Sequence, residues 1–168
     1  GTIRLMNEFP DQRAMVLEDP TLIPRMSEEA LRMVSPVIHM RRTAVEETEV
    51  NGQRIGKDEK VVLWYGAANR DPDVFANPDT FDMHRPNVEK HLAFGHGVHK
   101  CLGSRIAKMQ LRLAFERIFE RFPDIYWTGK QTIAPNALVH AISSMQVNLY
   151  GKNGRRPTQV AVPAAKSA

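Results

Sequence analysis

The sequence predicts a mainly α protein with small mixed β elements. Apolar residues recur at helical spacing in several runs, most clearly over residues 102–121, while residues 37–50 are rich in β-branched side chains. Proline borders many of these runs, as at Pro36 and Pro123, and therefore divides the chain into short elements. With 42% hydrophobic and 25% charged residues, the 168-residue chain has the composition of a globular protein with one core.

Three helices are expected before residue 35, over residues 1–9, 11–18 and about 24–34. Pro10 suits the start of the second helix, because a first-turn residue needs no backbone N–H for the helix. Asp19-Pro20 ends that helix, and Pro36 stops the third because the residue before a proline avoids the helical conformation. The chain then continues in an extended conformation.

The middle of the chain combines strands with irregular structure. Asn51-Gly52 predicts a hairpin turn that returns the chain through residues 53–55. A further strand, over residues 60–65, is apolar on both faces, so we expect it to lie in the interior. After a short helix at residues 67–70, the Pro- and Asp-rich stretch 71–91 is irregular, and a run of this length tends to be functional.

The C-terminal part begins with a long helix, residues 102–121, which has a broad apolar face. Short strands are expected around residues 125–128 and 141–149. Residues 151–168 are rich in Gly, Pro, Ala and basic residues, so we expect them to be disordered. Residues 1–150 are therefore the expected folded unit.

The chain has a single cysteine, Cys101, which excludes an internal disulfide. Three interpretations of its thiol are then open: an inert group in the core, a nucleophile, or a single thiolate ligand of a larger group. Gly95 and Gly97 precede it and Gly103 follows, so the backbone can pass close to a flat partner. The helix after it offers free N–H groups and a dipole that favour a thiolate. His99 is a candidate base for a nucleophilic cysteine, but no orienting carboxylate is evident, and the surroundings favour a ligand.

The pattern Phe-Gly-x-Gly-x-His-x-Cys-Leu-Gly over residues 94–103 resembles the heme-thiolate loop of the cytochrome P450 monooxygenases. The resemblance implies that Cys101 is the proximal ligand of heme b (iron protoporphyrin IX), donating electron density that favours O–O cleavage. It also implies that Phe94 packs beside the sulfur and that the three glycines let the loop lie against the porphyrin. His99 matches a position that hydrogen-bonds a heme propionate in some bacterial members. His96 falls at a variable position, so we expect no ligand role for it.

Arg41 matches a family arginine that pairs with a heme propionate, as its planar fork suits a carboxylate. Because two arginines stand together, Arg42 is an alternative at a register shifted by one residue.

Two further motifs resemble the same family. Glu29 and Arg32 lie at i and i+3 on one helix face, and Arg85 follows in the irregular stretch. In the family the three form a buried structural network, whereas the pair taken alone would be a solvated surface pair.

The resemblance places two segments beside the substrate: Val37, Ile38 and His39, and Leu138, Val139 and His140. Both are mostly apolar, as a pocket for a hydrophobic molecule requires, although plain strand core is the alternative.

Basic residues also recur at helical spacing near the cysteine: Lys100, Arg105, Lys108 and Arg112. On the family fold they face an electron donor, a ferredoxin or flavin protein that receives its electrons from NAD(P)H. The alternative is a solvated helix face.

For the complete protein the resemblance implies O₂-dependent insertion of one oxygen atom into a hydrophobic small molecule, such as an alkane, fatty acid or terpenoid. Two alternatives remain: a heme peroxygenase, and a partial non-catalytic fragment with weak or no heme binding. The chain resembles only the C-terminal portion of the P450 fold and lacks the distal helix, so we expect the isolated chain to be inactive. We expect a cytoplasmic bacterial protein without a membrane span. Its net charge of +4 is scattered, which argues against a nucleic-acid partner.

Overall fold

The computed structural model describes residues 1–153. Of the tail predicted to be disordered, residues 151–168, the first three residues form a turn and the others lie outside the described residues. The helices are α1 (Thr2–Glu8), α2 (Pro10–Glu18), α3 (Ile23–Val34), α4 (Tyr65–Ala68) and α5 (Ser104–Arg121), with 3-10 turns at Pro20–Leu22, Val88–Lys90 and Gly97–His99. The strands are β1 (His39–Thr43), β2 (Thr48–Val50), β3 (Gln53–Ile55), β4 (Lys60–Trp64), β5 (Tyr126–Ile133) and β6 (Ile142–Asn148). Among the described residues, none of the helices combines the length and the apolar character that a bilayer crossing requires.

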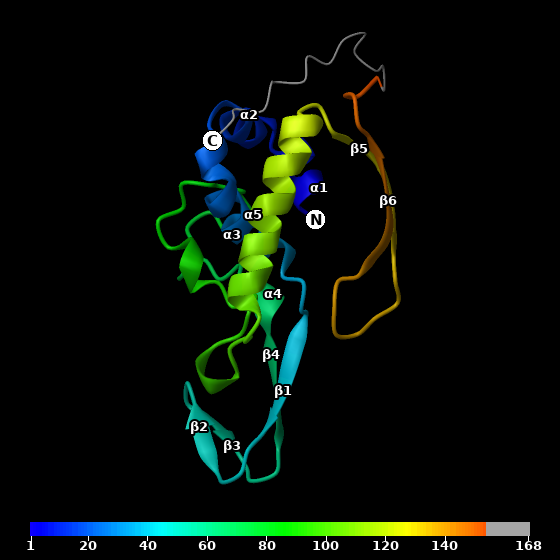
Figure 1. Cartoon of the computed structure of the whole chain (residues 1–168). Coiled ribbons are helices and arrows are strands. Elements are labelled where there is room, and N and C mark those ends of the chain that lie inside the picture. The colour runs from blue at the N-terminus through cyan, green and yellow to red at the C-terminus, as the bar shows by residue number, and fades with distance from the viewer. Residues whose placement is uncertain (154–168) are drawn as a thin grey trace.

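Helices form the body of the molecule, and the strands form narrow ribbons that extend from it (Figure 1). Within residues 1–153 the strands pair as three two-stranded antiparallel sheets: β1 with β4, β2 with β3, and β5 with β6. The predicted hairpin is confirmed, since Asn51 and Gly52 have positive φ angles of 48° and 79° and connect the paired strands β2 and β3. The expected extended segment is interrupted between Thr43 and Thr48.

The strand predicted over residues 60–65 is confirmed as β4, but the prediction that it lies in the interior is wrong. β4 is mostly exposed, and Trp64 at its end is 55% exposed. In the part of the chain that the structure describes, the sheet of β4 contains only β1 as a second strand. A strand is buried only where neighbouring elements cover its faces, and its apolar composition does not reveal whether they do.

The core of the helical body lies where α1, α2, α3 and α5 meet (Figure 1). α3 supplies Met26, which is fully buried, and α5 supplies Phe115 and Phe119. Phe81 and Met83, from the irregular stretch between α4 and α5, complete this cluster. α3 is strongly amphipathic, so packing its apolar face against α5 carries the neighbouring polar residues into the interior as well.

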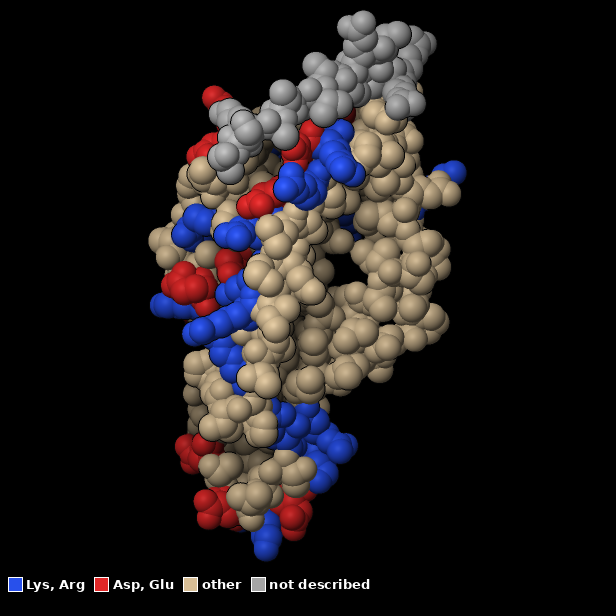
Figure 2. Space-filling view, viewed as in Figure 1, with Lys and Arg blue, Asp and Glu red and all other residues tan. Residues whose placement is uncertain are grey.

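α5 is the helix predicted after the cysteine, and it begins at Ser104 because the preceding residues form a turn. The Ser104 N–H donates to the Cys101 carbonyl at 3.2 Å. The apolar face predicted for this helix is divided: the side towards α3 is buried, while Ile106, Met109 and Leu113 are about half exposed. Figure 2 shows an uncharged strip along α5 with Lys and Arg side chains beside it.

Candidate functional site

The loop that presents Cys101 is held by its own backbone. The Cys101 N–H donates to the Phe94 carbonyl at 2.9 Å, which closes the loop at its base. Gly95 and Gly97 have φ angles of 71° and 68°, in the left-handed region that residues with a Cβ avoid. A Cβ on Gly95 would also lie 3.4 Å from the Tyr65 hydroxyl oxygen. Gly95 and Gly97 are therefore favoured by the backbone path of the loop, whereas Gly103, with a φ angle of −81°, is not.

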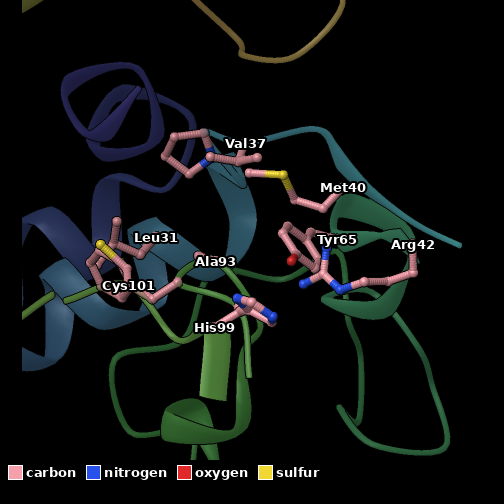
Figure 3. Close-up of a pocket in the computed structure, with 11 residues that line it drawn as sticks. Leu31, Val37, Met40, Arg42, Tyr65, Ala93, His99 and Cys101 are labelled. Carbon is pink, nitrogen blue, oxygen red and sulfur yellow. The ribbon is translucent and has the colours of Figure 1, made fainter. Parts of the chain in front are cut away.

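The loop borders a cavity of about 480 Å³, and the exposed thiol of Cys101 is part of its lining (Figure 3). The other lining residues come from α3, the segment after it, β1, α4 and the loop itself: Leu31, Pro36, Val37, Met40, Arg42, Tyr65, Ala93, Phe94, Gly95 and His99. Most of these side chains are apolar. The arrangement thus combines one thiol with a hydrophobic surface and a few polar groups, which is the composition of a small-molecule or cofactor site.

The structure places Arg42, and not Arg41, at this cavity. Side chains alternate between the two faces of a strand, so Arg42 shares a face of β1 with Met40, and both line the cavity. Figure 3 shows the guanidinium of Arg42 beside the Tyr65 ring. Of the two arginines that the sequence left as candidates for a propionate partner, the alternative Arg42 thus lines the cavity, and the pairing itself stays a prediction.

The two segments predicted to border a substrate lie side by side. Val37 and Val139 form an antiparallel bridge, and the Ile38 N–H donates to the Leu138 carbonyl at 2.8 Å. Of the predicted residues, Val37 lines the cavity beside Cys101, whereas His140 lines a separate cavity of about 390 Å³. The ring of His39 instead makes an edge-to-face contact with Trp64 at 4.9 Å between ring centroids. The structure thus brings the segments together but places Val37 alone among them at the thiol.

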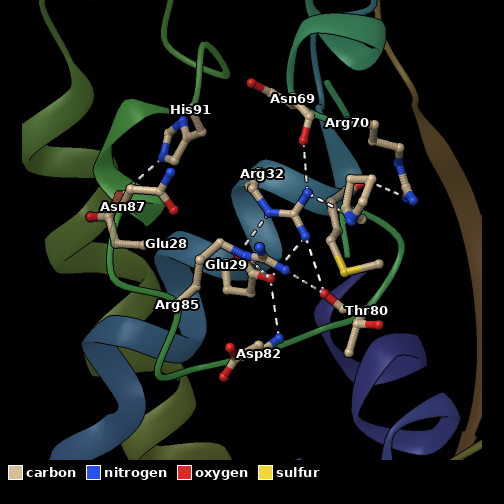
Figure 4. A network of polar contacts seen from close by, with 12 residues as sticks. Glu28, Glu29, Arg32, Asn69, Arg70, Thr80, Asp82, Arg85, Asn87 and His91 are labelled. Carbon is tan, nitrogen blue, oxygen red and sulfur yellow. Dashed lines mark hydrogen bonds and ion pairs between the residues drawn. The ribbon is translucent and has the colours of Figure 1, made fainter. Parts of the chain in front are cut away.

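The residues of the predicted network, Glu29, Arg32 and Arg85, meet in the interior beneath the loop (Figure 4). The Glu29 carboxylate accepts from Arg32 Nε at 2.7 Å and from Arg85 Nε at 3.0 Å. Arg32 also donates to the carbonyls of Asn69 and Pro78, at 2.7 and 2.8 Å. Every buried charge therefore has a partner, as the low dielectric of an interior demands. The network joins α3 to the irregular stretch that leads to Cys101.

Two polar groups near the loop were missed by the sequence analysis. Asn69 is fully buried and accepts from the Leu92 N–H at 2.6 Å, which ties the end of α4 to the segment before the loop. Glu28 lies between His91 and Lys108, at 3.0 and 2.6 Å. Burial alone would raise the pKa of Glu28, but the hydrogen bonds from these two residues outweigh it and hold that pKa below its ordinary value. Both contacts join residues distant in the chain, so no local motif reveals them.

The basic residues predicted to dock a partner differ in their surroundings. Lys100 and Arg105 are exposed beside the loop. Lys108 is paired with Glu28, and Arg112 makes an i,i+4 contact with Glu116 at 3.6 Å.

Two other residues of the motif do not line the cavity that contains Cys101. His96 lines a different cavity from Cys101, on the side of Val62 and Trp64. Gly103 is the N-cap residue of α5, and a Cβ there would lie 3.9 Å from the sulfur of Cys101.

Comparison with known proteins decides the family. The family model described as Cytochrome P450 matches residues 16–144. The chain belongs to the cytochrome P450 family. Linalool 8-monooxygenase of Pseudomonas putida is 41% identical over 151 residues, which are 90% of this chain and 37% of that protein. Cytochrome P450-terp of a Pseudomonas species is 42% identical over 130 residues, which are 77% of this chain and 30% of that protein.

The P450 fold is also found by structure. Cytochrome P450-153 from Novosphingobium aromaticivorans superimposes with a TM-score of 0.82 at 42% sequence identity. The matched region covers 88% of this chain and 37% of that one. The chain thus spans about a third of the length of the P450 proteins that it resembles.

Heme is the cofactor that the P450 family implies, and the residues of the site fit it. The chain offers a single thiol at an apolar surface, and Arg42 and His99 line the same cavity with side chains that can donate hydrogen bonds to carboxylates. Within residues 1–153, no group of three or more His, Cys, Asp or Glu side chains is arranged to hold a metal ion. One thiolate would suit an iron whose other ligands are the nitrogens of a macrocycle rather than protein side chains.

Proposed function

We propose that this chain forms the proximal, heme-binding part of a cytochrome P450 monooxygenase, with Cys101 as the thiolate ligand. The observation that supports this most directly is the exposed Cys101 thiol in the lining of an apolar cavity, on a loop closed by the Phe94 carbonyl. Heme, when bound, supplies the activation of O₂ and the insertion of one oxygen atom into the substrate.

The residues of this chain bind and orient the cofactor. The Phe94 carbonyl accepts the Cys101 N–H, so the backbone at the ligand is fixed before any metal binds. Arg42 and His99 would hold the heme propionates, since a guanidinium and an imidazole both donate to carboxylates. Leu31, Val37 and Met40 give the cavity an apolar wall against which the flat face of the porphyrin would pack.

We propose that the substrate is a hydrophobic small molecule of the alkane, fatty-acid or terpenoid class. The apolar side chains of the two predicted substrate segments, Val37, Ile38, Leu138 and Val139, support this. One relative of the chain is named for its action on linalool. A ferredoxin or flavin protein, supplied by NAD(P)H, would deliver the electrons.

The donor would dock where basic residues surround the Cys101 loop. Lys100 and Arg105 are exposed there, and Arg112 is exposed one turn beyond Lys108. Reversing the charge with Arg112→Glu should slow reduction by an acidic donor at low salt, and the difference should shrink at high salt because ions screen the attraction. Arg117→Glu is the matched control, since Arg117 lies farther along α5 and pairs with Glu120. Equal rates for the two variants at every salt concentration would refute this surface.

The central assignment is tested by the absorption spectrum of the heme-loaded protein that carries this chain, reduced under carbon monoxide. We expect Cys101→Ser to abolish the thiolate-type band and His96→Ala to retain it, because His96 lines a different cavity. Retention of the band in the Cys101 variant would overturn the ligand assignment. Turnover with peroxide that equals turnover with O₂ and a donor would replace the monooxygenase proposal with a peroxygenase.

A further inference from the structure

Glu28 is adjacent to Glu29 in α3 but its carboxylate is engaged by a different set of residues (Figure 4). One carboxylate oxygen lies 3.0 Å from Nε2 of His91, at the end of the Val88–Lys90 turn. The other lies 2.6 Å from Nζ of Lys108 in α5. Glu28 is thus shared between the segment that enters the Cys101 loop and the helix that leaves it.

His91 connects Glu28 to the backbone of the loop. Its side chain is 3% exposed, and its Nδ1 accepts the Ala93 N–H at 3.1 Å. A ring nitrogen that accepts carries no proton, so Nε2 is the protonated nitrogen and donates to Glu28. The imidazole therefore holds the residue directly before Phe94, and the Phe94 carbonyl in turn accepts the Cys101 N–H. Two hydrogen bonds thus tie Glu28 to Ala93, and the backbone continues from Ala93 to the Phe94 carbonyl, which accepts the Cys101 N–H.

Lys108 connects Glu28 to the side chain of the same phenylalanine. Its Nζ lies 5.7 Å from the centroid of the Phe94 ring, within the range of a cation–π contact. The His91 ring approaches the Phe94 ring from another side, with 6.0 Å between centroids. Both partners of Glu28 therefore lie beside the Phe94 ring, and His91 also accepts the N–H of the preceding residue, Ala93. The Lys108 side chain is 40% exposed, so this contact also reaches the surface.

We propose that Glu28 is a positioning residue for the thiolate loop: its carboxylate orients His91 and Lys108, and these two residues hold Phe94 and thereby Cys101. The inference rests on the proposed role of Cys101 as the heme ligand. Without the carboxylate, the buried imidazole loses its acceptor and Lys108 loses its counterion beside the Phe94 ring. The loop then samples more conformations, and the ligand is held less firmly.

The test compares Glu28→Gln with Glu116→Gln in the heme-loaded protein. Glu116 is a matched control, because the substitution is identical and its ion pair with Arg112 lies on the exposed side of α5. Two readouts are measured: the reduction potential of the heme iron, and the rate at which the thiolate-type carbon monoxide band is lost on mild warming. For Glu28→Gln we expect a shifted potential and a loss of the band about tenfold faster, as for a broken charged hydrogen bond. For Glu116→Gln we expect wild-type values.

Lys108 provides a second pair of variants. Lys108→Met removes the counterion of Glu28 but leaves Glu28 and His91 in place, so it should accelerate the loss of the band. Lys108→Arg keeps the positive charge and should retain the wild-type rate. If Glu28→Gln fails to load heme, this pair decides the question, and equal rates for both would overturn the inference. The inference is also overturned if Glu28→Gln and Glu116→Gln have the same reduction potential and the same rate of loss of the band. The same holds if Glu28→Gln changes neither of these and only lowers the midpoint of unfolding. A wild-type protein without the thiolate band would refute the proposed function itself.

Discussion

Removing the buried charge of Glu29 is the sharpest test of how the fold is held together. Glu29 and Arg32 are fully buried, and the Arg85 side chain is almost so. Glu29→Gln keeps the side-chain volume, so the substitution opens no cavity and isolates the effect of the charge. It leaves two buried guanidinium groups facing a neutral amide instead of a carboxylate.

The expected cost follows from this geometry. Glu29 accepts from Arg32, from Arg85 and from the Asp82 N–H, and an amide oxygen cannot replace both carboxylate oxygens. Removing one partner of a buried ion pair destabilises a protein by about 3–5 kcal/mol. That is a large part of the total stability of a typical domain, about 5–15 kcal/mol. We therefore expect Glu29→Gln to lower both the free energy of unfolding and the yield of heme-loaded protein.

The assay is urea unfolding of the heme-loaded protein, followed by far-ultraviolet circular dichroism at neutral pH. Stability changes without a change in compactness shift the midpoint and leave the slope unaltered. Glu120→Gln is the control, since Glu120 pairs with Arg117 on the exposed side of α5 and surface substitutions change stability by about 0.5 kcal/mol at most. Equal stability of the two variants would refute the reasoning that this network stabilises the fold.

Three further predictions concern the loop, its rim and its support. Gly95→Ala and Gly97→Ala should each lower the free energy of unfolding by about 1–2 kcal/mol, because both residues have a left-handed backbone that a Cβ strains. Urea titrations measure the loss, and wild-type stability of both variants would contradict it. Arg42→Gln should accelerate heme dissociation about three- to tenfold by removing a charged hydrogen bond, whereas Arg41→Gln should not; transfer of heme to an excess of apomyoglobin reports the rate. The pKa of Glu28 is depressed in the folded protein, so its stabilising contribution is present above its ordinary value of 4.5 and is lost as pH falls through the folded pKa. Glu28→Gln should reduce this acid dependence in a pH series of unfolding experiments, and an unaltered pH profile would contradict it.

Local signals in the sequence determined much of the fold and part of the site. The Asn51-Gly52 turn was predictable because a two-residue type I′ hairpin turn requires positive φ at both central residues, which Asn and Gly adopt readily. Glu29 and Arg32 were predictable as a pair because helical spacing places i and i+3 together. The conformational freedom of Gly95 and Gly97 was predictable from the motif, since the left-handed backbone that they adopt admits few other residues.

The tertiary structure decided what depends on contacts between distant segments. The choice between Arg41 and Arg42 is a choice between the faces of a strand, and a shift of one residue reverses it. The exposure of β4 depends on which elements cover its sheet, and the contacts of Glu28 with His91 and Lys108 depend on how α3 packs against α5. Spacing along the chain encodes only neighbours within a turn or a hairpin. The partners of a side chain across the core follow from the packing of whole elements.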